Sequence, residues 1–266
     1  MAQFEIKDGV AIIPEGAIEI GEDTFYDCSS LESVIIPESV TKIGDNAFGR
    51  CTSLESITLP DSVASIGWYA FTGCKSLKNI TLPDSVTFLG ENAFSRCTSL
   101  ESIAIPKSVT KVEHYAFDSC RSLTSITIPE SVIKIGIGAF RWCTSLKSIT
   151  IPESVAEIGC CAFMGCTSLK DITIPKSVTR IEQNAFKGCA SLKKVASPES
   201  VREIEEYAFE GCTLLTTVIL PVGLKEINLT AFYKCPSLST IYVPAEKTDY
   251  YKERLPEKLH DKIVEL

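Results

Sequence analysis

Ten cysteines recur at an interval of 23 residues along the chain, with no insertion or deletion between them. A leucine follows each cysteine after three positions and a proline after nine, without exception. So regular a period is the signature of a solenoid, in which similar units stack and each contacts only its neighbours. We therefore expect one elongated array from these 266 residues rather than one or two globular domains.

Each unit begins with a short strand. Ile126 and Ile128 alternate with polar residues, which puts two apolar side chains on one face of an extended segment. Pro129 then ends the strand because it lacks the N–H that a further ladder bond needs. A second apolar pair, Val132 and Ile135, predicts a short extended segment after the proline.

The unit closes with the pattern Ala-Phe-x-x-Cys, as at Ala139, Phe140 and Cys143. Adjacent apolar residues followed by another three positions later predict a single helical turn. Glycine often precedes this pattern, as at Gly44, but Glu113 fills the same place elsewhere, so a positive φ is not expected there. The predicted fold class is a repeat solenoid, mainly β with short helical turns, with a parallel sheet along one side.

The two ends depart from the repeat, as a solenoid requires to keep its terminal apolar faces out of water. Residues 1–13 alternate apolar and polar around Asp8-Gly9 and predict an N-terminal hairpin cap. Residues 14–244 form the tandem repeats, and residues 245–266 predict a C-terminal helical cap. Pro256 is expected to break this cap into two pieces, and its apolar positions are Tyr250, Leu255, Leu259, Ile263 and Leu266.

Charge and hydropathy exclude several classes of function. The net charge is −8, so nucleic acid and acidic membrane surfaces are expected to be repelled. No apolar run approaches the roughly 20 residues of a membrane-spanning helix, so membrane insertion is not expected. The first residues do not resemble a secretory signal, which predicts either a cytoplasmic chain or one whose signal has been removed.

The repeated cysteines are interpreted as a structural core ladder, because free cysteine is often buried and behaves as a small apolar side chain. Disulfides between neighbouring coils fit the distance requirement, but equivalent stacked side chains run parallel rather than converge. We refer to the column as the ladder cysteines; its core members are Cys51, Cys74, Cys97, Cys120, Cys143, Cys166, Cys189 and Cys212.

No metal, cofactor or catalytic centre is expected. Zinc needs four convergent ligands, whereas a column offers one thiol per coil and the chain has two histidines. His114 and Cys160 share a column but lie two coils, about 10 Å, apart. The repeated serines are expected to bond nearby backbone groups in turns, so an enzyme is not predicted.

Cys160 and Cys161 stand outside the ladder in columns that are polar in other coils, so both thiols are expected to be accessible. They are either neutral surface substitutions or have a redox or intermolecular role, with no basic residue nearby in the sequence to favour the thiolate.

Large side chains that replace polar ones in otherwise polar columns are the candidate partner-binding residues, because exposed apolar anchors are enriched in binding hot spots. They are Trp68, Tyr69, Phe88, His114, Tyr115, Ile137 and Trp142. The alternative is that each packs locally over a neighbouring turn. A second candidate surface is the column of strand threonines, Thr58, Thr81, Thr127, Thr150 and Thr173, which predicts a flat hydrogen-bonding face.

The repeat pattern, Cys-x-x-Leu-x-x-Ile-x-Ile-Pro-x-x-Val-x-x-Ile-Gly-x-x-Ala-Phe-x-x-Cys, resembles the BspA-like leucine-rich repeat over residues 14–244. The resemblance implies a curved right-handed coil and a non-enzymatic recognition scaffold, carried or secreted at the surface of host-associated bacteria or parasitic protists. The implied partner is a protein or glycoprotein surface. The favoured oligomeric state of this chain is a monomer. An intracellular interaction module and a structural spacer without a specific ligand remain alternatives.

Overall fold

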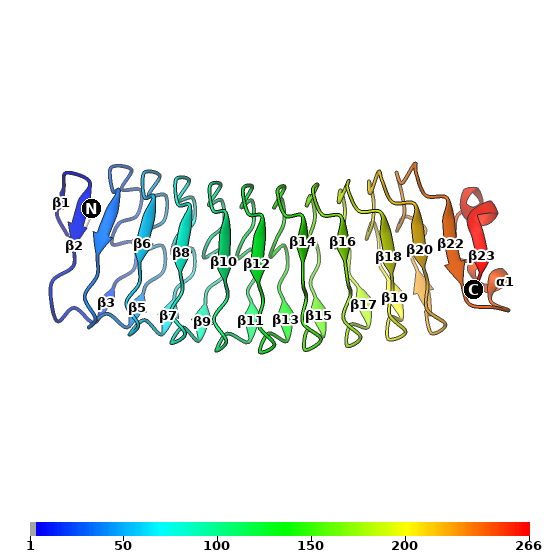
Figure 1. The fold of residues 1–266 in the computed structure, drawn as a ribbon, viewed down its shortest axis with the longest axis horizontal. Coiled ribbons are helices and arrows are strands. Elements are labelled where there is room, and N and C mark those ends of the chain that lie inside the picture. The colour runs from blue at the N-terminus through cyan, green and yellow to red at the C-terminus, as the bar shows by residue number, and fades with distance from the viewer. Residues whose placement is uncertain (1–3) are drawn as a thin grey trace.

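The computed structural model describes residues 4–266, which form an elongated stack of coils. A first row of parallel strands contains one strand from each coil, in register so that Ile103 lies opposite Ile126. Figure 1 shows these strands side by side along the stack. They are β4 (Ser33–Ile35), β6 (Ser56–Thr58), β8 (Asn79–Thr81), β10 (Ser102–Ala104), β12 (Ser125–Thr127), β14 (Ser148–Ile149), β16 (Asp171–Ile172), β18 (Lys194–Ala196), β20 (Thr217–Ile219) and β22 (Thr240–Val243).

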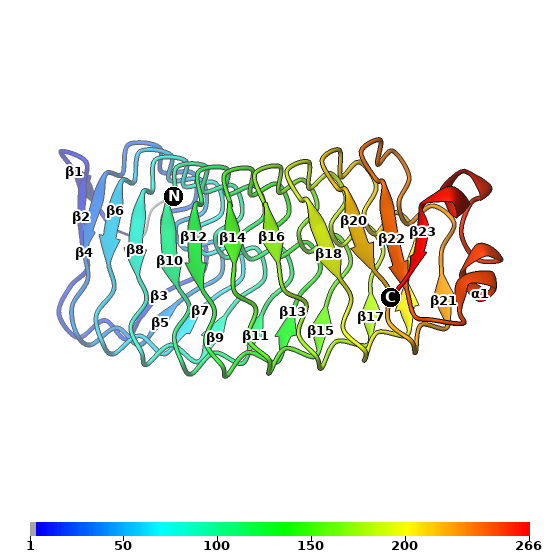
Figure 2. The same cartoon turned by 45° about the vertical axis from the view of Figure 1, so that its right-hand side comes forward.

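The parallel sheet expected along one side is thus confirmed, and the structure adds a second row. The extended segment after each proline pairs in parallel with its equivalent in the next coil, as Lys134 does with Glu157. Figure 2 shows this row running along the stack as well. Its strands are β3 (Glu19–Ile20), β5 (Lys42–Ile43), β7 (Ser65–Ile66), β9 (Phe88–Leu89), β11 (Lys111–Val112), β13 (Lys134–Ile135), β15 (Glu157–Ile158), β17 (Arg180–Ile181), β19 (Glu203–Ile204) and β21 (Glu226–Ile227).

Where the sequence predicted a helical turn, the structure has overlapping β-turns. Within one coil, the N–H of Cys120 donates to the carbonyl of Phe117 at 3.3 Å, whereas the N–H of Phe117 donates to Ala139 of the next coil at 2.9 Å. Tyr115 and Ser119 have positive φ values of 55° and 60°. A helix cannot continue through left-handed residues, so the backbone bonds alternate between its own coil and the next.

The core is a set of stacked columns. The rings of Phe48 and Phe71 are 5.2 Å apart, and those of Phe94 and Phe117 are 5.7 Å apart, with nearly parallel planes. The ladder thiols lie beside them, and each from Cys51 to Cys235 donates to the phenylalanine carbonyl of the preceding coil, as Cys97 does to Phe71 at 3.1 Å. Sequence reasoning treated these cysteines as apolar, whereas the structure also uses their weak S–H donor.

The frequent glycine before the turns is explained by close approach of backbones rather than by φ. Gly90 has no positive φ, but a Cβ added there would lie 2.5 Å from the carbonyl carbon of Gly67 in the preceding coil. Glu113 fills the same place in another coil, so glycine is preferred there but not compulsory, as the sequence predicted.

The first end carries an antiparallel hairpin of β1 (Ile6–Lys7) and β2 (Val10–Ile12), joined through Asp8 and Gly9. β2 then pairs in parallel with β4, which continues the first row. Residues 1–3 of the predicted cap lie outside the described residues. A division into cap, repeats and cap at residues 13 and 244 remains our interpretation.

The second end differs from the predicted helical cap. α1 (Thr248–Lys252) and the 3-10 helix η1 (Glu257–Lys262) flank Pro256, but β23 (Ile263–Glu265) is a strand that pairs with β22. The prediction that Ile263 and Leu266 form part of a helical lid was therefore wrong, because the open edge of β22 offers backbone partners to this segment. Tyr251 is fully buried and donates its hydroxyl to the carbonyl of Pro221 at 2.5 Å. Within residues 4–266, neither helix has the length and apolar character needed to cross a bilayer.

Candidate binding surface

The overlapping turns that precede the ladder cysteines form one side of the stack, which we call the turn side. Two positions have positive φ in each of the turns that end at Cys28 to Cys212, the fifth and the first residue before the ladder cysteine, and in the last turn only Lys234 has one. Asparagine and glycine suit this conformation, and they occupy it at Asn46, Asn92, Gly138 and Gly188. Bulkier residues occupy most of the remaining positions, namely Arg50, Tyr69, Arg96, Tyr115, Trp142, Cys161, Tyr207 and Lys234.

Three of the predicted partner-binding residues are therefore held in an unfavourable backbone conformation. Tyr69, Tyr115 and Trp142 have φ values of 58°, 55° and 58°. A left-handed conformation costs a non-glycine residue about 1–2 kcal/mol. Backbone strain of this kind tends to gather at functional sites, so the turn side is a candidate for recognition.

Most of the predicted residues are exposed, but the structure does not gather them into one patch. Trp68 is 52% exposed, Tyr69 43% and Trp142 42%. Tyr69 and Tyr115 line a groove on the turn side, whereas His114 and Ile137 line a second groove beside β13, β15 and β17. Trp68, Phe88 and Trp142 line neither groove, and Phe88 lies on β9 of the second row.

Local packing accounts for the placement of several rings. The ring of Trp142 lies against Gly165, and the ring of Tyr115 against Gly138, so closely that neither glycine could carry a Cβ. Tyr26 lies in the same way beside Gly49. These rings pack over a neighbouring turn, as the alternative interpretation proposed, and Trp142 and Tyr26 still expose about two fifths of their surface.

The first groove, which we call the turn groove, has a volume of about 810 Å³ and spans the coils that end at Cys28 to Cys143. Three tyrosines and four basic side chains line it, together with acidic and neutral polar residues. The tyrosines are Tyr26, Tyr69 and Tyr115, and the basic residues are Arg50, Lys75, Arg96 and Arg141. The sequence did not reveal this groove, because its basic residues come from three columns that are not basic throughout.

The electrostatics of the turn groove differ from those of the whole chain. Arg141 is paired with the buried Asp118 at 2.7 Å, and its guanidinium lies 5.1 Å from the ring centroid of Tyr115. Among residues 4–266, no ion pair involves Arg50, Lys75 or Arg96. The groove thus holds four basic and three acidic side chains, Asp27, Glu91 and Asp118, on a chain whose net charge is −8.

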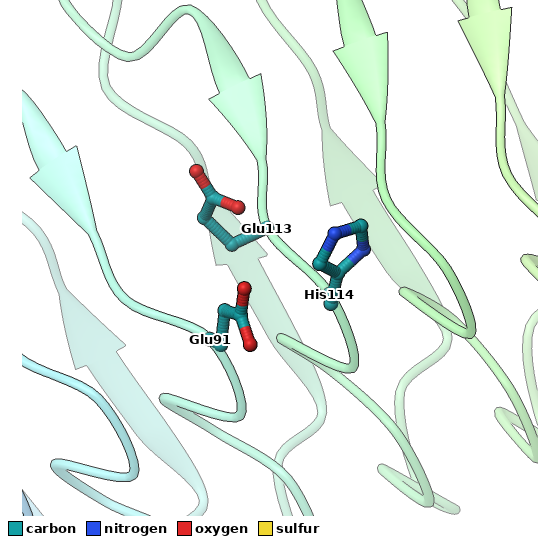
Figure 3. A group of neighbouring side chains, drawn as sticks. All are labelled: Glu91, Glu113 and His114. Atoms are coloured by element: carbon teal, nitrogen blue, oxygen red, sulfur yellow. The ribbon is translucent and has the colours of Figure 1, made fainter.

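One cluster of potential metal ligands lies at the start of the turns. Glu91, Glu113 and His114 each place one ligand atom within 4.8 Å of the others, and Figure 3 shows them projecting from two successive coils. Sequence reasoning missed this cluster, although Glu91 and His114 occupy the same column in adjacent coils.

The hydrogen bonds at this cluster oppose metal binding. Nδ1 of His114 accepts the N–H of Ile137 at 2.8 Å, which places the proton of the neutral ring on Nε2 and leaves no free lone pair. Glu113 is paired with Lys111, whose ammonium group lies against the carboxylate. These residues fit an ordinary network of backbone caps and ion pairs better than a cation site.

All twelve cysteines are free, and the ladder members from Cys51 to Cys235 are buried. Burial raises the pKa of Cys51 to about 12 and that of Cys166 to about 12. A protonated thiol in a dry interior is a poor nucleophile and a poor metal ligand, so the ladder serves packing.

The two cysteines outside the ladder are half-buried rather than freely accessible. Cys160 donates weakly to Glu182 at 3.6 Å, and burial together with that carboxylate raises its pKa. Burial also raises the pKa of Cys161, although Arg141 and Lys187 oppose the change. The sequence suggested no basic residue nearby, but stacking brings both from adjacent coils.

Comparison with known proteins identifies the repeat. A family model described as a BspA type leucine rich repeat region matches residues 18–147 and 133–254. The chain therefore belongs to the BspA type leucine-rich repeat family. Comparison with curated proteins gives no significant match.

Several solved structures are similar to the chain. A leucine rich cell surface protein of Faecalibacterium prausnitzii is 28% identical, with 87% of this chain and 86% of that chain covered and a TM-score of 0.45. The leucine rich repeat protein of T. pallidum is also 28% identical, over 80% and 87%, with a TM-score of 0.49. The pneumococcal vaccine antigen PcpA is 21% identical, over 97% and 79%, with a TM-score of 0.57, and shares the fold.

Proposed function

We propose that the protein is a non-enzymatic binding scaffold that recognises a protein or glycoprotein surface through the turn side of its stack. The observation that carries this proposal is the set of exposed aromatic residues in strained turn positions, Tyr69 and Trp142 above all. A rigid array that keeps such side chains in place loses little conformational entropy on binding. Membership of the BspA type family supports a setting at the cell surface or outside the cell.

An intracellular interaction module is the second candidate. It is favoured by one observation, the complete set of free cysteines, because reducing compartments preserve thiols. The same surface would then face an intracellular protein. Sequence upstream of the encoded chain separates the two candidates, since an encoded secretion signal would exclude the intracellular one.

The binding role is tested with the fluorescently labelled protein on cultured epithelial cells and on immobilised extracellular-matrix proteins. Trp68→Ala and Trp142→Gly are expected to weaken binding at least tenfold, since truncating a hot-spot residue costs about 2 kcal/mol or more. Glycine suits the positive φ of position 142, so the second variant is expected to fold. Phe88→Ala, on the second row of strands, shows whether exposed aromatics elsewhere also contribute. Unchanged binding in both tryptophan variants would favour the spacer without a specific ligand.

A further inference from the structure

The coils that line the turn groove carry a periodicity of two coils that the 23-residue repeat does not explain. The coil ending at Cys51 holds Asp45, Asn46 and Arg50, and the coil ending at Cys97 holds Glu91, Asn92 and Arg96 in the same columns. The intervening coil ending at Cys74 holds Trp68, Tyr69 and Gly73, and the coil ending at Cys120 holds His114, Tyr115 and Ser119. Four consecutive coils thus alternate between a type with an acidic, an amide and a basic residue in these columns and a type with two aromatic side chains.

This alternation sets a fixed spacing between like groups. Strands of successive coils are about 4.8 Å apart, so Arg50 and Arg96 are offset by about 10 Å along the stack, as are Tyr69 and Tyr115. Gly73 lies between the two arginines, and a Cβ added there would come within 3.6 Å of Cγ of Arg50. A small residue therefore keeps the space between the two cations open.

The backbone gives independent support for a role of these four side chains. Arg50, Tyr69, Arg96 and Tyr115 all have positive φ, between 55° and 62°. The same two columns hold glycine or asparagine in other coils, which relieves this strain. Glycine and asparagine at the equivalent positions show that the turn itself does not require arginine or tyrosine there.

We infer that the turn groove binds an extended β-linked polysaccharide built of disaccharides, with one carboxylate in each disaccharide. Tyrosine rings present flat faces to the C–H groups of pyranose rings, and arginine pairs with carboxylates through two hydrogen bonds. The rise of one sugar in such a chain is close to the spacing of one coil. An acidic sugar at every second position then meets Arg50 and Arg96, and the neutral sugars meet Tyr69 and Tyr115.

The lining of the groove favours a glycan over a polypeptide. Protein hot spots fill desolvated apolar pockets, whereas the turn groove is lined by Asn46, Thr52, Thr72 and Asn92 in addition to its charged residues. These amide and hydroxyl side chains can donate hydrogen bonds to the hydroxyl groups of sugars and accept hydrogen bonds from them. An acidic glycan of this kind is repelled less by a protein of net charge −8 than nucleic acid is. Its carboxylates are about 10 Å apart, whereas the charges of duplex DNA are about 1.7 Å apart.

The inference rests on the proposed binding function and names a polysaccharide, rather than a protein surface, as the ligand of the turn groove. It is tested by isothermal titration calorimetry of the full chain with a hyaluronan octasaccharide, which alternates glucuronate and N-acetylglucosamine. The double variant Arg50→Gly/Arg96→Gly is expected to lose at least tenfold in affinity and to keep or raise its melting temperature, because glycine suits both φ values. Lys234→Gly is the matched control, because Lys234 is a cation in the same column, has a positive φ and lies outside the groove. The affinity of this variant for hyaluronan is expected to equal that of the wild type.

Three further probes complete the test. A chitin octasaccharide, which is neutral, and a β-linked polymannuronate, which has a carboxylate on every sugar, are both expected to bind at least tenfold more weakly than hyaluronan. Equal binding of poly-glutamate would indicate an acidic peptide and overturn the inference, as would a lack of hyaluronan binding or an unchanged affinity in the double arginine variant. If hyaluronan does not bind while the tryptophan variants still weaken binding to cells, the glycan inference fails and the scaffold proposal stands.

Discussion

Alkaline pH is predicted to unfold the stack through its ladder thiols. Burial raises the pKa of Cys51 and Cys166 from an ordinary value of 9.0 to about 12, so ionising either thiol in the folded state costs about 4 kcal/mol more than in the unfolded chain. The stabilising contribution of each thiol is complete below pH 9 and is lost progressively as the pH rises toward 12, because the folded state then binds more protons than the unfolded one.

The effect is large because many equivalent thiols act together. Each thiol lowers the free energy of unfolding by about 1.4 kcal/mol per pH unit in this range, and the eight fully buried ladder cysteines together give a slope of about 11 kcal/mol per pH unit. A typical stability of about 5 to 15 kcal/mol is therefore exhausted within one to two pH units above 9.

The assay follows circular dichroism and the ultraviolet absorbance of thiolates during the same pH titration. Both signals are expected to change together, because the ladder ionises only as the stack unfolds. Cys97→Ala removes one ionising group and is expected to reduce the slope of unfolding free energy against pH by about 1.4 kcal/mol per pH unit. An absorbance rise near pH 9 larger than the three half-buried thiols Cys28, Cys160 and Cys161 can give, with constant circular dichroism, would refute the argument.

Three other predictions follow from particular contacts. Phe117→Ala, in the stacked ring column, is expected to reduce the free energy of unfolding by about 3–5 kcal/mol in urea titrations, and the exposed Phe88→Ala by less than about 1 kcal/mol; equal losses would contradict the column as the core. Gly90→Ala is expected to cost about 1–3 kcal/mol, because its Cβ meets the backbone of Gly67; a neutral result would mean that the coils separate easily. Hydrogen bonds and charge from Lys187 and Lys234 hold the pKa of Glu210 below its usual value. Glu210→Gln is therefore expected to destabilise the protein at neutral pH and to match the wild type once acid has protonated Glu210. A difference in stability that persists in acid would argue against this pairing.

The stacking of the coils could be predicted from the sequence because it depends on features that recur in every unit. The cysteine, leucine and proline columns fix the 23-residue coil, and Ile126 and its equivalents fix the inward face of the first row. The second row was predicted only as an extended segment, since two residues such as Lys134 and Ile135 are too few to show a strand period. β23 was predicted as helix because the spacing of Leu259, Ile263 and Leu266 suits a helix, and only the exposed edge of β22 decides otherwise.

The turns were harder to predict because their sequence obscures their conformation. Asn46 and Gly138 indicate positive φ, but Tyr69, Arg96 and Trp142 occupy the same conformation and gave no such signal. The turn groove and the pairing of Arg141 with Asp118 arise between coils, so they depend on which columns become neighbours after stacking. The candidate binding residues were found from the sequence by their departure from polar columns, but the sequence did not show that four of them line two separate grooves and the other three line neither.

The central claim of this account is that recognition takes place on the turn side of the stack rather than on its first row of strands. The most direct measurement compares the binding of two labelled variants to the same epithelial cells, Tyr69→Glu on the turn side and Thr127→Glu on the strand side. The account predicts at least a tenfold loss of binding in Tyr69→Glu and wild-type binding in Thr127→Glu. Loss in Thr127→Glu with unchanged binding in Tyr69→Glu would contradict it and assign recognition to the threonine column.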